Sequence, residues 1–200
     1  MSPRLPAARR RRQLLDVALQ VFAERGFHDA SMNDIAEAAG VTKPVLYQHF
    51  RSKRELFGEL LADCGTELQD AITKAVVAAE SSREMVELGF DAYFRYVAAH
   101  RDAFNLFYGI GSAREDEFVE LVEGVVDALA ELVAGFIEIE GIQPEQRRLL
   151  GHGIVGMIEG ASTHWLKHAD GADPAVVACQ LADLAWRGLR GVHPGDAPVG

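Results

Sequence analysis

The chain has 200 residues, of which 48% are hydrophobic, and it carries a formal net charge of −10. This length suits one compact domain or a small domain joined to a larger one. The sequence holds no uninterrupted apolar run of about eighteen residues, which excludes a membrane-spanning helix and favours a cytoplasmic protein. Its two cysteines, Cys64 and Cys179, lack metal-motif spacing and are expected to be free thiols.

The first twelve residues, MSPRLPAARRRR, hold two prolines and five arginines. No apolar segment follows them, so they do not form a secretion signal. We expect residues 1–12 to be a flexible basic arm that orders, if at all, on a phosphate backbone or in a minor groove. A plain solvated tail is an equal alternative.

Helix signals begin after this arm. An apolar stripe over residues 14–22 predicts a first helix that ends at Gly26. Ser31 and Asp34 have the spacing of a capping box, in which each side chain binds the other residue's backbone amide, so a second helix starts there. Gly40 stands where that helix must stop and the backbone must turn.

A third helix follows the turn, with Thr42 placed as its cap. Two short helices joined in this way form a helix-turn-helix, whose second helix enters the major groove of DNA. Leu46 and Phe50 are expected to point inward. The remaining candidates for DNA contact are Thr42, Lys43, Val45, Tyr47, Gln48, His49 and Lys53. An ordinary helical corner with a solvated basic rim is the alternative.

Each candidate has a chemical reason. Thr42 and Lys43 can reach phosphate or base edges, Gln48 can pair bidentately with adenine, and Val45 can contact a thymine methyl. The charge distribution supports this interpretation, because residues 1–56 hold ten Lys and Arg against six Asp and Glu, a net of +4. The remainder is therefore −14, and a basic segment on an acidic body binds a polyanion in one orientation.

Three runs resemble the TetR family of bacterial transcriptional regulators: FAERGF at 22–27, IAEAAGV at 35–41, and LYQHF at 46–50 followed by Lys53. The resemblance covers roughly residues 12–60. It implies that Tyr47, His49 and Lys53 touch backbone phosphate. It also implies an all-α fold of about nine helices, three for DNA and about six for ligand binding and dimerisation.

The rest of the chain is helical by pattern, without a convincing strand. A long helix from about Ser52 to Glu80 is expected to bridge two domains, at residues 13–57 for DNA binding and 58–192 for ligand binding and dimerisation. Further helices are expected near 82–100, 102–109, 114–139, 144–168 and 174–190, before a polar tail at 193–200. Asp173 and Pro174 are a strong start signal for the last of them.

Eight aromatic residues lie between Phe90 and Phe118, enough to wall an apolar chamber or simply to form core. A narrower resemblance, carried by VLYQHF, VGM at 155–157, WL at 165–166 and AW at 185–186, is to actinobacterial regulators of fatty-acid metabolism that sense long-chain acyl-CoA. It implies an acyl tunnel lined by Phe94, Phe104, Phe107, Met157 and Trp165. The CoA phosphates would then meet Arg95, Arg101 or Arg114.

Small residues recur in the last two helices. Because glycine weakens a helix by about 1 kcal/mol relative to alanine, this pattern indicates close packing of another helix. We expect a homodimer interface at Gly153, Gly156, Gly160, Ala178, Ala182 and Ala185. Packing within one chain is the alternative.

The sequence contains few motifs typical of catalysis or metal binding. His164 and His168 have a spacing that can hold zinc, but no third ligand stands at a firm distance, so we expect no metal and no cofactor. The sequence lacks GxSxG and P-loop motifs and predicts no enzyme. The leading hypothesis is a homodimeric repressor that binds a palindromic operator and responds to a small apolar effector. The alternative is a small-molecule carrier or sink without specific DNA binding.

Overall fold

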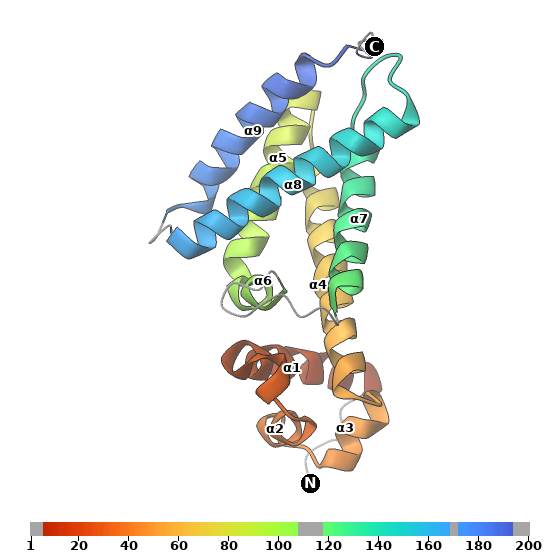
Figure 1. The fold of residues 1–200 in the computed structure, drawn as a ribbon, viewed down its shortest axis with the longest axis vertical. Coiled ribbons are helices and arrows are strands. Elements are labelled where there is room, and N and C mark those ends of the chain that lie inside the picture. Colours follow the sequence, from red (N-terminus) through yellow and green to blue (C-terminus); the bar gives the residue numbers. More distant parts are fainter. Residues whose placement is uncertain (1–5, 108–117, 169–171, 194–200) are drawn as a thin grey trace. The chain divides into compact units, whose positions relative to one another are not determined.

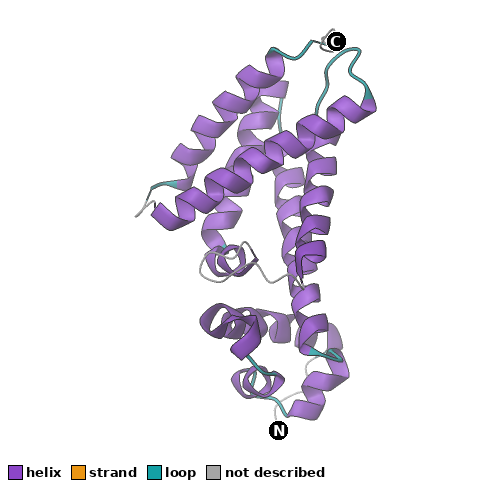
Figure 2. Cartoon of the chain, in the orientation of Figure 1, coloured by secondary structure: helices purple, strands orange, loops and turns teal. Residues whose placement is uncertain are grey.

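The computed structural model describes residues 6–107, 118–168 and 172–193, and within these ranges all regular structure is helical (Figures 1 and 2). This confirms the predicted all-α fold. The helices are α1 (Ala7–Asp29), α2 (Met32–Ala38), α3 (Lys43–His49), α4 (Lys53–Val76), α5 (Ser82–Ala99), α6 (Arg101–Phe107), α7 (Val119–Gly135), α8 (Pro144–His168) and α9 (Pro174–Arg190). None of these described helices is long and apolar enough to cross a membrane.

The chain divides into two compact units. The head contains the described residues of Met1–Cys64 and Asp102–Val122, and the body contains those of Gly65–Arg101 and Glu123–Gly200. The head thus extends to Cys64, beyond the predicted boundary at residue 57, and it also includes a segment distant in sequence. Phe118 of this segment packs into the head: its ring lies 4.5 Å from that of Phe27 and 4.3 Å from that of Phe57, measured between centroids.

Local signals set the helices of the head. Ser31 Oγ accepts from the amide of Asp34 at 3.2 Å, and Asp34 accepts from the amide of Ser31 at 2.9 Å, which confirms the capping box. Gly26 and Gly40 have φ of 77° and 63°, in the left-handed region that glycine tolerates. Gly26 therefore breaks the helical path of α1 at the predicted position, although the last turn continues to Asp29.

The start of α1 differs from the expected flexible arm. The helix begins at Ala7, so residues 7–12 are helical. Two of the arginines in this segment bind acceptors within the head: Arg12 Nη1 lies 2.6 Å from Asp63 Oδ2, and Arg10 Nη1 donates to Gln13 at 2.8 Å. These contacts give the arginines a structural role that the sequence pattern did not reveal.

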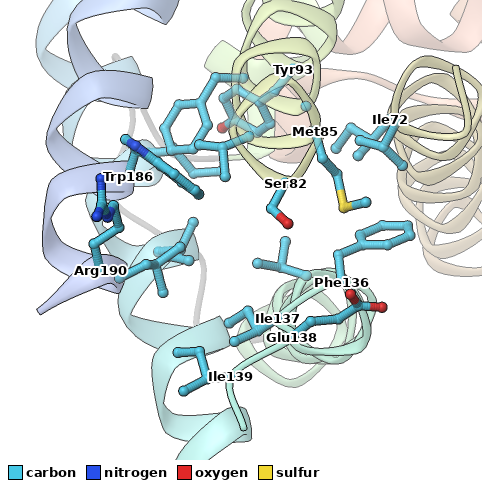
Figure 3. A pocket seen from close by; sticks show the side chains of 18 of the residues that line it. Ile72, Ser82, Met85, Tyr93, Phe136, Ile137, Glu138, Ile139, Trp186 and Arg190 are labelled. Atoms are coloured by element: carbon cyan, nitrogen blue, oxygen red, sulfur yellow. The ribbon is translucent and has the colours of Figure 1, made fainter. Parts of the chain in front are cut away.

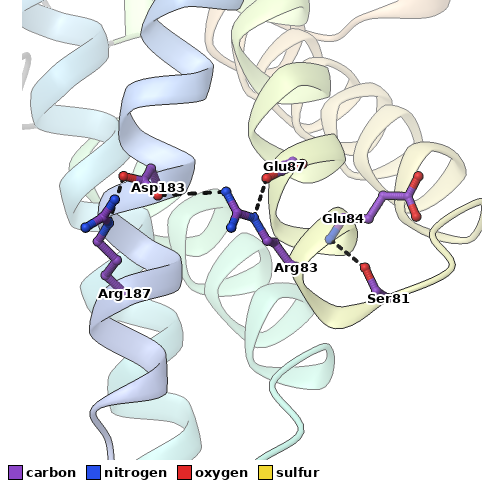
Figure 4. Close-up of polar contacts among 6 residues, drawn as sticks. All are labelled: Ser81, Arg83, Glu84, Glu87, Asp183 and Arg187. Atoms are coloured by element: carbon purple, nitrogen blue, oxygen red, sulfur yellow. Dashed lines mark hydrogen bonds and ion pairs between the residues drawn. The ribbon is translucent and has the colours of Figure 1, made fainter.

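In the body, α5 and α9 pack along most of their length. The buried face of α9 consists of Ala178, Ala182 and Ala185, which are small enough for close helix approach. Figure 4 shows exposed ion pairs that also join the two helices. Asp183 lies 2.8 Å from Arg187 on its own helix and 4.0 Å from Arg83 on α5.

Helix α7 packs closely on both α4 and α8. A Cβ on Gly65 would lie 2.9 Å from a methyl of Val125, and one on Gly151 would meet the backbone of Ala130. Helix α7 ends at Gly135, earlier than the predicted 139. Tight-turn bonds from the amides of Phe136 and Ile137 close its last turn, and Gly141 then takes a φ of 79°.

Candidate DNA-binding face and ligand cavity

Recognition helix α3 presents a polar face. Leu46 is fully buried and Phe50, just after the helix, is 1% exposed, so these residues anchor the inner side. The outer side carries the predicted DNA contacts: Thr42, Lys43, Tyr47 and Gln48 are exposed, and Val45 and His49 are half-buried. Thr42 is the N-cap residue, but its side chain makes no cap hydrogen bond. The helix thus offers hydroxyl, ammonium, phenol and amide groups on one surface.

Lys53, the remaining predicted DNA contact, is the first residue of α4 and does not belong to α3. Its ammonium donates to three carbonyl oxygens, those of Phe27 at 2.5 Å, His28 at 3.0 Å and Ala30 at 2.7 Å. It also lies 4.3 Å from the centroid of the Phe27 ring. An ammonium has three N–H donors, so these carbonyls occupy all of them. The phosphate contact that the family resemblance implied for Lys53 stays a prediction.

Arg11 makes a second unexpected contact. Its Nη1 donates to the carbonyl oxygen of His49 at 2.8 Å, its Nη2 pairs with Glu59, and its guanidinium lies 4.4 Å from the Phe50 ring centroid. The end of α3 is therefore bound to α1 and α4. Sequence reasoning missed Arg11 because it sits within a run of four arginines.

The body contains an apolar cavity of about 340 Å³ (Figure 3). Aliphatic and aromatic side chains from α4, α5, α7, α8, α9 and the segment after α7 form most of its wall. Polar side-chain groups in the lining belong to Ser82, Tyr93, Glu138, Trp186 and Arg190. Figure 3 shows Ser82 and Met85 of α5 directed into the space bordered by Phe136 and Trp186. The volume falls within the range of small-molecule sites, about 300–1,000 Å³.

Phe90 and Tyr93 of the predicted aromatic cluster line this cavity, but none of the described residues of the implied acyl tunnel does. Phe94 and Trp165 are buried core residues whose rings meet at 5.8 Å between centroids, and Phe104 is buried in the head. Met157 is half-buried outside the lining. Arg114 lies outside the described residues, and of Phe107 only the backbone, at the end of α6, is described.

Arg95, the predicted anchor for a CoA phosphate, is exposed and forms an ion pair with Asp91 at 2.6 Å. The hydrogen bond to Asp91 raises the pKa of the Arg95 guanidinium above its ordinary value. Its position on the outer side of α5 does not contribute to the cavity. Arg190 at the end of α9, which sequence reasoning did not select, lines the cavity instead.

The predicted dimer residues separate into two groups. Gly153, Gly156 and Gly160 are exposed on α8, and a Cβ on any of them would meet nothing within 4 Å. Packing among the described residues therefore does not require these glycines. Ala178, Ala182 and Ala185 are buried on the face of α9 that packs within the body. That face is already covered within one chain, as the alternative of packing within one chain expects.

The histidine pair carries no metal site by itself. The rings of His164 and His168 lie 4.8 Å apart between centroids. Over the described ranges, no group of three His, Cys, Asp or Glu side chains is arranged to hold a metal ion.

A helix-turn-helix with an exposed polar recognition helix, continued by a helical body, defines a DNA-binding regulator. The comparisons with known proteins specify the class further. Residues 14–60 match the family described as bacterial regulatory proteins, tetR family, and residues 82–188 match the tetracyclin repressor-like C-terminal domain. The chain belongs to the TetR family. Its members are transcriptional regulators, not enzymes.

Curated relatives align over nearly the whole chain. The transcriptional activator FasR of Mycolicibacterium smegmatis is 30% identical over 190 residues, covering 94% of this chain and 87% of FasR. The transcriptional repressor KstR2 of Rhodococcus jostii is 34% identical over 188 residues, covering 94% and 82%. The solved structure of Bacillus subtilis FadR in complex with stearoyl-CoA has a TM-score of 0.73 at 18% identity, covering 91% of this chain and 99% of that one. It shows the shared fold.

Proposed function

We propose that the chain is a homodimeric repressor whose two α3 helices read a palindromic operator. The observation that carries this proposal is the outer face of α3, where Lys43, Tyr47 and Gln48 are exposed beside the exposed cations Arg51 and Arg54. A two-fold dimer presents two such helices to successive major grooves, which matches a symmetric site. Lys43, Tyr47 and His49 supply phosphate contacts, and Gln48 and Val45 read bases.

The dimer face would be the exposed side of α8. Gly153, Gly156 and Gly160 form a flat strip there, next to Leu149, which is 72% exposed. On α9, Leu184 is 58% exposed, and a Cβ added to Gly188 would meet nothing within 4 Å. Glycine strips let two helices approach closely, and the outward leucines supply apolar area for burial on association.

The effector would occupy the cavity of the body. Its wall is mostly apolar with a few polar side-chain groups, so it suits a molecule with an apolar body and one polar end. A long-chain acyl-CoA fits this description if the acyl chain enters the cavity and the CoA stays outside near Arg190. The stearoyl-CoA named in the FadR structure supports this choice of first test ligand.

The ligand would act through α4. Ile72 and Val76 of α4 line the cavity, and the same helix begins at Lys53 in the head. Binding that favours one position of α4 shifts the population of head arrangements and so changes DNA affinity. We propose that the ligand releases the protein from DNA. Relatives include both an activator, FasR, and a repressor, KstR2.

Mobility shifts on DNA from upstream of the chain's own gene test this function. We expect a retarded complex that survives excess scrambled duplex and dissociates when stearoyl-CoA is added. Native mass spectrometry with acyl-CoAs of several chain lengths gives the binding partner directly. Acyl-CoA binding without sequence-specific DNA binding would instead support the carrier alternative.

A further inference from the structure

We propose that Gly89 of α5 is a specificity-determining residue that sets the length of acyl chain that the body cavity accepts. This role rests on the proposed function, which places an acyl chain in the cavity, and it names the residue that limits that chain. Gly89 lines the cavity from the interior of α5. Glycine weakens a helix interior relative to alanine, so its presence there needs a reason.

Neither the backbone nor the packing at position 89 requires glycine. Gly89 has the negative φ of an ordinary helical residue. A Cβ added to it would meet Cγ1 of Val76 at 3.4 Å, the near limit of ordinary van der Waals contact. Gly151 of α8 differs, because a Cβ there would collide with the carbonyl oxygen of Ala130. Gly151 therefore serves helix packing, whereas Gly89 leaves space open.

The α5 residues along the cavity define its outer and inner ends. Ser82 is exposed and Met85 is half-buried. Further along the helix, Phe90 is 7% exposed and Tyr93 is 2% exposed, so the inner end lies near Tyr93. Gly89 stands seven residues after Ser82 and four before Tyr93, about 10 Å and 6 Å along the helix axis. A chain that runs from the outer to the inner end must pass Gly89.

Charge in the lining marks the outer end. Glu138 and Arg190 are the charged residues that line the cavity, and both are exposed. The phosphates of an acyl-CoA stay hydrated, because burial of a charged group is costly. The ligand therefore keeps its polar group at the exposed end and directs its apolar chain inward.

Hydrogen bonds hold the inner end in place. The hydroxyl of Ser162 donates to the carbonyl oxygen of Ile158 at 2.6 Å and lies 3.3 Å from the hydroxyl of Tyr93. Ile158 of α8 and Tyr93 of α5 both line the cavity. Ser162 is 2% exposed, and breaking the hydrogen bonds of a buried hydroxyl is costly. The inner end therefore does not retreat before a longer chain, and the depth of the cavity is fixed.

A side chain at position 89 would fill space between the two ends. Gly89 and Val76 both line the cavity, so atoms beyond a Cβ at position 89 would extend into it. Leucine has four side-chain carbons and would displace about four methylenes of an acyl chain. With glycine, the protein accepts a chain that is longer by a similar amount.

Affinity measured as a function of acyl length tests this role. In titration calorimetry with saturated acyl-CoAs from hexanoyl to eicosanoyl, each buried methylene should raise affinity about fourfold until the chain fills the cavity. We expect Gly89→Ala to move this break about one methylene shorter and Gly89→Leu about four. The acyl-CoA at the wild-type break should bind Gly89→Leu at least about tenfold more weakly. An unchanged break in Gly89→Leu would overturn the proposal.

Two variants control for effects other than space. Gly124→Leu on α7 makes the same change outside the lining, where a Cβ meets nothing within 4 Å, and should keep the wild-type break. Gly89→Ala guards against unfolding. Because alanine favours a helix, we expect this variant to melt no lower than wild type. A lower melting temperature would show that packing requires the glycine and would contradict the proposal.

Straight-chain alkanols from hexanol to tetradecanol separate this role from the proposed function, because they need no recognition of CoA. If the wild-type protein binds no acyl-CoA, the proposed effector fails, while an alkanol break that Gly89→Leu moves to shorter chains still supports the role of Gly89. If acyl-CoAs release DNA but Gly89→Leu keeps the wild-type break, the proposed function stands and the role of Gly89 is refuted. Binding of neither series refutes both.

Discussion

The carbonyl oxygen of His49, the last residue of recognition helix α3, accepts a 2.8 Å hydrogen bond from Nη1 of Arg11. The two residues are 38 positions apart in the chain. Helix α3 has only seven residues, too few to be stable alone, since isolated helices shorter than about 12 residues are marginal in water. Its orientation therefore depends on contacts with α1 and α4, and the head binds DNA as one packed unit.

Gln48 and Lys43 should respond differently to truncation. We expect Gln48→Ala to lose about 1–3 kcal/mol at the cognate site and to relax preference at one base pair, because it removes a base contact. Lys43→Ala should weaken binding to every duplex similarly. A panel of operators with single base-pair changes measures both effects. Equal losses from Gln48→Ala on cognate and scrambled DNA would show that Gln48 does not read a base.

The glycine strip on α8 allows a matched test of dimerisation. We expect Gly156→Leu to place an isobutyl group in the dimer face and shift the protein to monomers in sedimentation experiments. Gly124→Leu on α7 is the control, since a Cβ there also meets nothing within 4 Å. Both changes should raise intrinsic helix stability by several tenths of a kcal/mol. Dimers of unchanged affinity in Gly156→Leu would exclude this face.

The cavity and the sequence-predicted pocket can be distinguished by two truncations. We expect Phe136→Ala to weaken acyl-CoA binding about tenfold or more, because burial of a Phe side chain is worth about 1.5–3 kcal/mol. Met157→Ala, at a position predicted from sequence but outside the cavity, should bind like wild type. The chain has two tryptophans, so the Trp165→Phe protein reports through Trp186 fluorescence. Reversed effects of the two truncations would place the ligand elsewhere.

Acid should weaken the start of α2. Hydrogen bonds from the Ser31 side chain and backbone, together with Arg25, lower the pKa of Asp34 below its ordinary value of 3.8. The folded protein then binds this proton less tightly than the unfolded chain does. The stabilisation is complete above that ordinary value and is lost as pH falls through the lowered one. In urea unfolding, Asp34→Asn should be less stable than wild type at neutral pH, and the difference should shrink in acid.

Local sequence signals predicted the local structure well. The Ser31 and Asp34 capping box, the turn at Gly40 and the cap at Asp173 all depend on residues within a few positions of one another. The contacts that place the site are long-range. Lys53 meets Ala30 across 23 positions, and no pattern in the sequence identifies a carbonyl as its partner.

The cavity and the dimer face were harder to predict for related reasons. A cavity is the space left after side chains pack, so aromatic content alone does not locate it, and Phe94 became core while Trp186 became lining. Small residues permit any close helix contact. Ala182 uses that property to pack within the body, whereas Gly156 faces open space. Only tertiary packing separates these cases.

Selection of binding sites from a random duplex library by the full-length protein tests the central claim most directly. The account predicts enrichment of a two-fold symmetric sequence whose half-sites change when Gln48 is replaced. Enriched half-sites that are indifferent to Gln48, or no enrichment over the starting library, would contradict a dimeric regulator that reads its operator through α3.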